Sequence, residues 1–367
     1  MRAALAALAA LVALAGCGSL ENVTRGGKVV GDTLTVYTLL PQPGEGNARD
    51  VVDAVKLGLY EAGGTAGEFA VNYVSVDENA PAVQLRESIA DPQVTALIGP
   101  FGSETAMTVV PLFNEAGILQ VTPGAGYAGF TEVVRPGEPE RWQPSGRRTL
   151  ARLVGDDLAQ SRALLAAAGA ASGKERPRVA IEQEPGPVAD ALVAALQEAG
   201  ARTVGAPTRA DAVIYAGDDA HNAAGVGDAL AGEAPGTPVV YPDALTFAGV
   251  EQRLGPAARR RAVLVSSAPE PGSTPRLRDF ERRFRARYDR PPGPYGAVGY
   301  EAIRSVLAAI AAAGNRAGYR QEVIDAYFAD ADRPDSVTGP YRLQPDGRRA
   351  PAPFTATRPG RGSLGSN

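Results

Sequence analysis

From residue 34 onward, apolar runs of strand length alternate with segments of helical period, and this alternation limits the fold more than any other feature. Residues 34–40 form a β-branched and apolar run, and Val51, Val55 and Leu59 then recur at the spacing of one helix face. A chain in which strands and helices follow one another builds parallel sheets covered by helices. Further strands are predicted at 69–76, 94–98, 118–121, 178–181, 213–215, 239–241 and 262–266, and further helices at 81–90, 105–115 and 158–168.

A break at residues 135–148 divides this alternation into two series. The segment is crowded with proline, glycine and charge, and it carries the only tryptophan, Trp142. Because it lacks periodicity, we interpret it as a surface excursion near a domain boundary. A chain of 367 residues has the length of two ordinary domains, so we predict an α/β protein with two lobes.

The N-terminal end has the features of an export signal. Arg2 gives a short positive start, residues 3–13 are apolar, and residues 14–17 read Leu-Ala-Gly-Cys, the pattern of a bacterial lipobox. The apolar stretch is too short to span a bilayer, so we predict a signal peptide that is removed before Cys17, the only cysteine. A lipid on Cys17 would then anchor the protein to the membrane through a flexible tether at 18–32. The alternative is an ordinary signal peptide with a chance cysteine.

The charge of the chain argues against a polyanionic partner. Lys and Arg number 37 against 41 Asp and Glu, which gives a formal net charge of −4, and the two signs are interleaved. Phe280, Phe284 and Tyr288 form an apolar stripe at helical spacing, and the arginines between them lie largely off that stripe. We interpret these arginines as a solvated helix face and expect no nucleic-acid partner.

Little in the sequence supports catalysis. His221 is the only histidine, which excludes a multi-histidine metal centre, and no G-x-S-x-G sequence surrounds any serine. Residues 124–129 match G-x-G-x-x-G, but they do not open a helix in the first βαβ unit as a dinucleotide site does. The adjacent acids Asp77 and Glu78 are interpreted as helix-start residues rather than a metal site or an acid pair. We expect no enzyme, cofactor or metal, although two carboxylates distant in sequence can still converge in a fold.

Several short motifs follow one another in order along nearly the whole mature chain. They are AVKLGLYEAGG at 54–64, DENAP at 77–81, LIGPFGS at 97–103, NEAGI at 114–118, VTP at 121–123, YEA at 300–302 and GPYRL at 339–343. In this order the chain resembles the type I periplasmic binding proteins, specifically the branched-chain amino-acid receptor group of ABC transporter substrate-binding proteins. The resemblance rests on the ordered series rather than on any single motif.

The resemblance implies two Rossmann-like lobes with parallel central sheets, joined by a hinge of three crossovers, and a small-molecule ligand in the cleft between them. The general rule for open α/β sheets also places a ligand at the carboxyl ends of the strands. The resemblance further implies an ABC transporter permease as partner and an extracytoplasmic location. The predicted division is 1–17 signal peptide and lipobox, 18–32 tether, 33–150 with 270–333 first lobe, 151–269 with 334–360 second lobe, and 361–367 tail.

Ser103 is the first candidate for ligand binding. With Gly102 before it, Ser103 lies where the strand predicted at 94–98 gives way to a helix. A hydroxyl beside free helix N–H groups suits an anionic oxygen such as a carboxylate. The matching serine has this role in the family, and the alternative is a serine that only caps its helix.

The loop at 122–127 is the second candidate, and there the chain departs from the family. The resemblance implies that the Gly124 carbonyl contacts the ligand. The family's hydroxyl residue aligns with Gly126, so that contact is lost. Tyr127 is expected either to replace it, as a polar group or an aromatic wall, or to have a purely structural role.

The second lobe contributes Asp243, which follows the strand predicted at 239–241. Its position matches the acid that neutralises the ligand ammonium in the family, and the alternative is an ordinary loop or cap aspartate. The family's tyrosine is replaced by the sequence EPGP at 184–187. We therefore expect a carboxylate-bearing ligand other than leucine, isoleucine or valine. A lipoprotein of the same fold that acts as a regulator or sensor through protein contacts is the alternative function.

Overall fold

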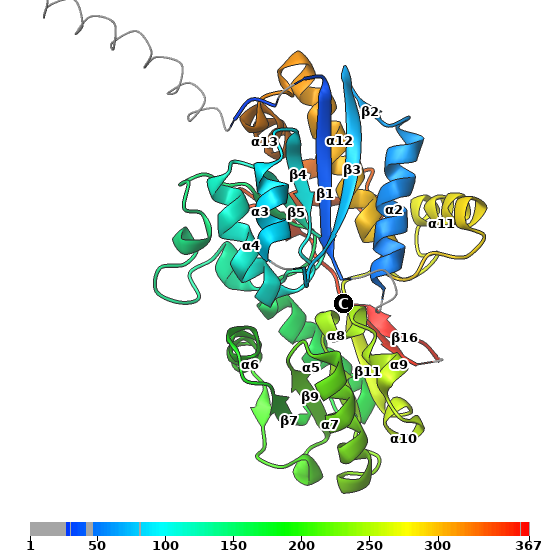
Figure 1. The fold of residues 1–367 in the computed structure, drawn as a ribbon. Coiled ribbons are helices and arrows are strands. Elements are labelled where there is room, and N and C mark those ends of the chain that lie inside the picture. The colour runs from blue at the N-terminus through cyan, green and yellow to red at the C-terminus, as the bar shows by residue number, and fades with distance from the viewer. Residues whose placement is uncertain (1–26, 30, 42–46, 81, 360, 367) are drawn as a thin grey trace, which may run out of the picture.

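The computed structural model describes residues 27–29, 31–41, 47–80, 82–359 and 361–366. Cys17 and the signal peptide lie outside the described residues, so their predictions stay predictions. The described chain forms two lobes, one above the other in Figure 1, each built around a mainly parallel sheet. This is the predicted α/β fold class.

The first lobe is built on a six-stranded sheet in the order β2-β3-β1-β4-β5-β6, which is parallel except for β2. Alternate residues of β1 face opposite layers: Leu34 and Val36 pack with the helices α12 and α13, and Leu39 packs with α3 and α4. Both faces are therefore covered, which explains the nearly continuous apolar runs seen in the sequence. The strands are β1 (Thr33–Leu40), β2 (Thr65–Ala66), β3 (Phe69–Asp77), β4 (Val94–Ile98), β5 (Leu119–Thr122) and β6 (Leu150–Arg152); the helices are α2 (Ala48–Glu61), α3 (Ala82–Ala90), α4 (Ser103–Glu115), α11 (Pro275–Tyr288), α12 (Gly296–Ala313) and α13 (Arg320–Ala329).

The second lobe is built on a seven-stranded sheet in the order β16-β15-β11-β10-β9-β7-β8. The five strands from β11 to β8 in this order are parallel, and β15 and β16 add an antiparallel edge. Helices α5 and α6 pack on one face, and α7 to α10 on the other. The strands are β7 (Arg178–Gln183), β8 (Arg202–Thr203), β9 (Ala212–Ala216), β10 (Val239–Tyr241), β11 (Ala262–Ser266), β15 (Thr355–Arg358) and β16 (Arg361–Ser366); the helices are α5 (Asp157–Ser172), α6 (Pro187–Glu198), α7 (Ala220–Glu233), α8 (Asp243–Phe247), α9 (Val250–Arg253) and α10 (Pro256–Arg259).

The chain passes between the lobes three times: after β6, after β11 and before β15. The third passage lies later than the predicted boundary at residue 334. Between it and α13, the strands β12 (Asp332–Arg333), β13 (Tyr341–Leu343) and β14 (Arg349–Ala350) form a small antiparallel sheet. Tyr341 and Leu343 are buried in the core of the first lobe, which holds this segment there until the chain reaches β15.

One helix among the described residues, α12, is long and apolar enough to cross a membrane by length and composition. It is a core helix, because Ile303, Val306 and Ile310 are fully buried against the first sheet.

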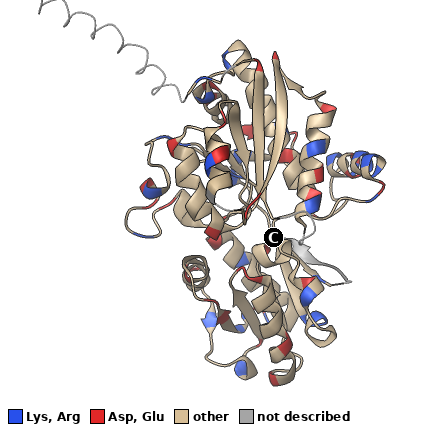
Figure 2. Cartoon of the chain, viewed as in Figure 1, with Lys and Arg blue, Asp and Glu red and all other residues tan. Residues whose placement is uncertain are grey.

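The two segments that the sequence set apart have structural roles. The excursion at 135–148 stays with the first lobe, and its Trp142 is buried, edge-on to the rings of Phe130 and Tyr127. Most arginines of α11 are exposed, and Figure 2 shows acidic and basic residues interspersed along the ribbon of both lobes. Arg283 is paired with Asp279 on the same helix. This agrees with a solvated helix face.

Candidate functional site

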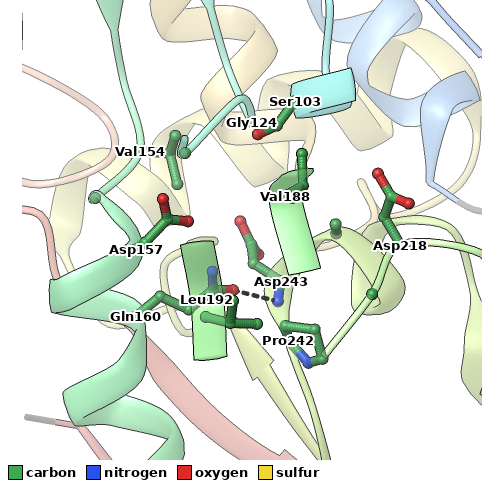
Figure 3. A pocket seen from close by; sticks show the side chains of 14 residues that line it. Ser103, Gly124, Val154, Asp157, Gln160, Val188, Leu192, Asp218, Pro242 and Asp243 are labelled. Atoms are coloured by element: carbon green, nitrogen blue, oxygen red, sulfur yellow. Dashed lines mark hydrogen bonds between the residues drawn. The ribbon is translucent and has the colours of Figure 1, made fainter. Parts of the chain in front are cut away.

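The carboxyl ends of the two sheets face each other across a cleft, and a cavity of about 30 Å³ lies between them. The first lobe contributes the residues that follow β4 and β5, and the second contributes those between β6 and the first turn of α5, those of α6, and those after β9 and β10. By the measure of about 10–15 Å³ for one water molecule, the cavity has room for only a few waters. Its lining is Ser103, Gly124, Gly126, Val154, Gly155, Asp157, Gln160, Val188, Leu192, Gly217, Asp218, Pro242, Asp243 and Ala244 (Figure 3).

Ser103 lines this cavity as the first residue of α4, with Gly102 as the N-cap. Its hydroxyl oxygen accepts the backbone N–H of Tyr127 at 3.2 Å. The first turn of a helix presents N–H groups that have no carbonyl partner within the helix. The structure therefore places a hydroxyl and a helix N-terminus beside the cavity, whereas Gly102 itself does not line it.

Gly124 and Gly126 line the same cavity, and both lie where the chain is tightly packed. A β-carbon at Gly124 would lie 2.4 Å from the ring of Phe101, and one at Gly126 would lie 3.0 Å from the carbonyl oxygen of Gly155. The Gly126 carbonyl accepts a hydrogen bond from the buried guanidinium of Arg152 at 3.0 Å. Close backbone packing at Gly126 therefore leaves little room for the side chain that would carry the family's hydroxyl.

Tyr127 does not line the cavity. Its side chain is fully buried, and its hydroxyl donates to the carboxylate of Glu138 at 2.8 Å. The ring packs against Phe130 and Trp142. These contacts are those of a core residue and keep the Tyr127 ring and hydroxyl away from the cavity.

Asp243 lies opposite Ser103, at the start of α8, and is 3 % exposed. One carboxylate oxygen accepts the Ser267 N–H and the Tyr295 hydroxyl, at 2.8 and 2.5 Å, and the other accepts the Ser267 hydroxyl at 2.7 Å. Burial raises the pKa of this carboxyl, and the three hydrogen bonds act against that rise. Because Tyr295 belongs to the first lobe, Asp243 also ties the lobes together.

The sequence analysis missed Asp157, the first residue of α5, which follows β6 and is 5 % exposed. One of its carboxylate oxygens accepts the Ala128 N–H at 2.9 Å. Within the described part of the chain, no hydrogen bond reaches the other oxygen, and the carboxylate points into the cavity (Figure 3). Burial raises its pKa to about 7, although the Ala128 hydrogen bond and the charge of Arg152 lower it.

A wider pocket of about 290 Å³ adjoins the cavity and shares Gly217 and Asp218 with it. We call it the acidic pocket. The Glu184 carboxylate accepts the Tyr215 hydroxyl at 2.7 Å and the Asp218 N–H at 2.9 Å, and a β-carbon at Gly217 would clash with it. The lining residues of the acidic pocket are Glu104, Glu184, Pro185, Ala189, Gly217, Asp218, Asp219 and Asn222.

Asp218 was also missed, although an acid in the loop that follows a predicted strand was a usable signal. Burial raises its pKa to about 6, and the nearby charges of Glu104 and Glu184 add to the rise. Glu104 comes from the first lobe and reaches the loop before α6, where a β-carbon at Gly186 would lie 2.9 Å from its carboxylate. Acids from both lobes therefore meet at this pocket.

Glu78 does not have the helix-start role predicted for it. Its carboxylate accepts the Phe101 N–H at 3.2 Å, so among the described residues it holds the loop between β4 and α4. Burial raises the pKa of Glu78 to about 7, with smaller contributions from the charges of Asp77 and Asp218. The neighbouring Asp77 accepts the Asn79 N–H in the turn after β3.

On the side of the cleft next to the crossing segments, apolar contacts join the lobes. Phe101 stacks on Phe247 with ring centroids 3.3 Å apart, and Tyr295 lies edge-on to both rings. The side-chain amide of Asn47 donates to the carbonyl oxygens of Thr246 and Phe247 at 3.2 Å. We call Phe101, Phe247 and Tyr295, with the buried residues Leu40, Ala48, Val51, Val52 and Ala268, the hinge-side cluster.

Comparison with known families agrees with the resemblance seen in the sequence and with the two-lobed fold. The family model described as periplasmic binding protein matches residues 42–362. The chain belongs to this family. Within it, the fold is that of the type I periplasmic binding proteins, and the similarity extends to the branched-chain amino-acid receptors. No protein in the curated set matches the sequence.

Three solved structures illustrate the shared fold of these periplasmic binding proteins. The isoleucine complex of LivJ from Streptococcus pneumoniae has 16% identity and a TM-score of 0.73, over 91% of this chain and 99% of that one. The leucine-binding protein LivK from Thermotoga maritima has 16% identity and a TM-score of 0.73, over 91% and 97%. A solute-binding protein of an ABC transporter from R. palustris, in complex with benzoate, has 21% identity and a TM-score of 0.68, over 90% and 94%.

Proposed function

We propose that this chain is the solute-binding protein of an ABC transporter, lipid-anchored outside the cytoplasm, and that it binds a small carboxylate-bearing molecule between its lobes. Its family, and similar proteins whose structures were solved in complex with isoleucine and benzoate, support a solute-binding role. An amino acid or a related molecule is the expected ligand class.

The proposal rests on one cavity that both lobes line. Some of its lining groups favour a negatively charged ligand group, and others favour a positively charged one. The first lobe contributes the Ser103 hydroxyl at the N-terminus of α4, which favours negative charge. Asp243, from the second lobe, and Asp157 favour a cation. A ligand with a carboxylate and an ammonium group would therefore bridge the cleft.

The cavity of about 30 Å³ is too small for an amino acid, so the lobes must separate before such a ligand can bind. The three crossing segments act as the hinge in this proposal. Closure is then a population shift, stabilised by contacts that the ligand makes with both lobes. Small-angle X-ray scattering with and without ligand should show a smaller radius of gyration at saturation, and an unchanged radius would contradict hinge closure.

The membrane anchor is tested separately. Cys17→Ser should abolish lipid attachment and release the processed protein from the membrane fraction, whereas wild type should remain bound. Processing of the wild type should be sensitive to globomycin, an inhibitor of lipoprotein signal peptidase. If the processed Cys17→Ser protein stays as firmly bound as wild type, another anchor is present.

Ligand binding is tested by native mass spectrometry of gently purified protein, followed by titration calorimetry. We expect a retained small molecule, and we expect Ser103→Ala to weaken its binding by about 1 to 3 kcal/mol, the range for a hydrogen bond to a charged group. Ser273→Ala is the control, because Ser273 is an exposed serine outside the cleft. Undiminished affinity in Ser103→Ala would remove Ser103 from the site.

The smallness of the cavity also supports a second candidate, a regulator or sensor that acts through protein contacts. The lobes already meet through the hinge-side cluster and through Arg135, which donates to the Pro187 carbonyl oxygen at 3.3 Å. Such a protein would retain no small molecule on native mass spectrometry and would instead co-purify with an envelope protein.

A further inference from the structure

The carboxylate of Asp243 is held by donors from both lobes. Ser267, directly after β11 of the second lobe, donates its backbone N–H to one oxygen at 2.8 Å and its hydroxyl to the other at 2.7 Å. Tyr295, from the first lobe, donates its hydroxyl to the first oxygen at 2.5 Å. An ionised carboxylate offers about four acceptor positions, so one position remains, on the oxygen that only the Ser267 hydroxyl reaches among the described residues.

The ring of Tyr295 is fixed by contacts with both lobes. Tyr295 directly precedes α12, and its side chain is fully buried in the hinge-side cluster. The ring lies edge-on to Phe101 of the first lobe and to Phe247 of the second, with centroids 5.4 and 5.2 Å away. Because the hydroxyl oxygen is rigidly attached to the ring, the packing that fixes the ring also fixes the position of the donor.

Tyr295 adds to Asp243 what the second lobe does not supply. The backbone of Asp243 is held within that lobe, because its N–H donates to the side-chain oxygen of Gln160 at 2.8 Å. The carboxylate is buried, and a buried carboxylate keeps its charge only where donors replace the lost water. Without the Tyr295 hydroxyl, the oxygen that it reaches would keep the Ser267 N–H alone. The carboxylate would then turn more freely and take up a proton more readily, and both changes weaken its attraction for an ammonium group.

We propose that Tyr295 is a positioning residue for ligand recognition, which reaches across from the first lobe and holds the Asp243 carboxylate in the orientation that binds a ligand ammonium group. This rests on the proposed function, in which the ammonium group of the ligand binds near Asp243. Tyr295 is not among the residues that line the cavity, so it acts through Asp243 rather than by touching the ligand. Recognition of the ammonium group by the second lobe then depends on contact with the first lobe.

A purely structural role for the Tyr295 hydroxyl predicts a different pattern of ligand affinities. If the hydroxyl only joined the lobes, its loss would weaken closure around every ligand that bridges the cleft, with or without an ammonium group. If it positions Asp243, the loss falls on ligands that carry the ammonium group, because the ligand carboxylate is bound at Ser103 in the other lobe. Two ligands that differ only in the ammonium group therefore separate the two roles.

The test is titration calorimetry on the full mature protein freed of bound ligand. The common amino acids are screened first, and each one that binds is compared with its desamino analogue, as phenylalanine is with 3-phenylpropanoate. Tyr295→Phe keeps the ring and removes only the hydroxyl. It should weaken amino-acid binding by about tenfold or more, as expected for a lost hydrogen bond to a charged group, and change binding of the desamino analogue less than about threefold.

Two further variants and one measurement without ligand sharpen the test. Tyr241→Phe is the matched control, because Tyr241 ends β10, is fully buried, and has a hydroxyl without a hydrogen-bond partner among the described residues. It should leave both affinities unchanged. Ser267→Ala removes a donor to the same carboxylate and should show the same selective loss as Tyr295→Phe. In crystal structures of the ligand-free proteins, the Asp243 carboxylate should leave its wild-type position in Tyr295→Phe.

The outcomes separate this inference from the function it rests on. Equal losses for the amino acid and its desamino analogue in Tyr295→Phe would overturn the positioning role and leave amino-acid binding intact. An Asp243 carboxylate that stays in place in the Tyr295→Phe crystal structure would also overturn it, as would a selective loss in Ser267→Ala alone. If wild type binds no amino acid and native mass spectrometry finds no retained molecule, the proposed function fails, and this inference fails with it.

Discussion

The two sides of the cleft join the lobes in opposite ways. The hinge-side cluster is apolar and buried, with Phe101 stacked on Phe247 and Tyr295 bonded to Asp243. The acidic pocket on the other side brings Glu104 near Asp218 without a counter-ion in its lining. Apolar contacts therefore join the lobes on the hinge side, whereas like charges from the two lobes oppose each other at the acidic pocket.

The largest expected effect comes from removing the aromatic stack. Phe247→Ala should lower the free energy of unfolding by about 3 to 5 kcal/mol, because it leaves a cavity beside Phe101 and Tyr295. Urea denaturation of the ligand-free protein measures this loss. Val133→Ala is the control, since Val133 is 77 % exposed and its loss should change stability by less than about 0.5 kcal/mol. A loss below about 1 kcal/mol for Phe247→Ala would show that the hinge-side cluster does not hold the lobes together.

A smaller effect is expected from adding one carbon next to this stack. A β-carbon at Gly124 would lie 2.4 Å from the Phe101 ring, so Gly124→Ala should cost about 1 to 3 kcal/mol of stability. Gly205→Ala is the matched control, because no atom lies within 4 Å of a β-carbon there. Equal urea midpoints for the two variants would mean that the Phe101 ring is free to move aside.

Three acids at or beside the cleft, Asp157, Glu78 and Asp218, predict that the ligand-free protein becomes more stable on acidification. The folded pKa values of Asp157 and Glu78 are about 7, and that of Asp218 is about 6, all above their unfolded values. A carboxyl with a raised folded pKa contributes stability that is full below its unfolded pKa and is lost as pH rises through its folded pKa. The melting temperature should therefore fall from about pH 5 to about pH 8.

The same pH titration has an internal control. Asp218→Asn should make the fall less steep, whereas Asp335→Asn, at an exposed position, should leave the slope unchanged. A melting temperature that is constant over this range in wild type would contradict the unfavourable burial of these acids.

The smallest effect is expected from Glu104, which is exposed at the mouth of the cleft. Glu104→Gln removes one repulsive charge and should raise the melting temperature of the ligand-free protein by roughly 1 °C at low ionic strength. The gain should disappear at high salt, because exposed charges are screened. Glu68→Gln, far from the cleft in the turn between β2 and β3, should give no gain at either salt concentration.

Local patterns in the sequence were sufficient to predict the layers of this fold and the helix start at Ser103 beside the cavity. The apolar runs and helical spacings predicted β1, β3, β4 and their helices within a few residues, because each element buries a face that repeats along the chain. Ser103 was placed at the start of a helix for the same local reason. Ser103, Gly124, Gly126 and Asp243, predicted from the resemblance together with the strand-end rule, all line the cavity.

The tertiary structure alone decided which other side chains reach the cleft. Tyr127 lies in the same loop as Gly126, yet its hydroxyl turns to Glu138, because Glu138 and Trp142 from the later segment at 135–148 fold back against its side chain. Asp157 and Asp218 enter the site because two sheets from separate halves of the chain meet end to end. The sequence determined the order of strands and helices through short-range periodicity. The charge of the cleft depends instead on long-range contacts between the lobes, and no local sequence pattern predicts those contacts.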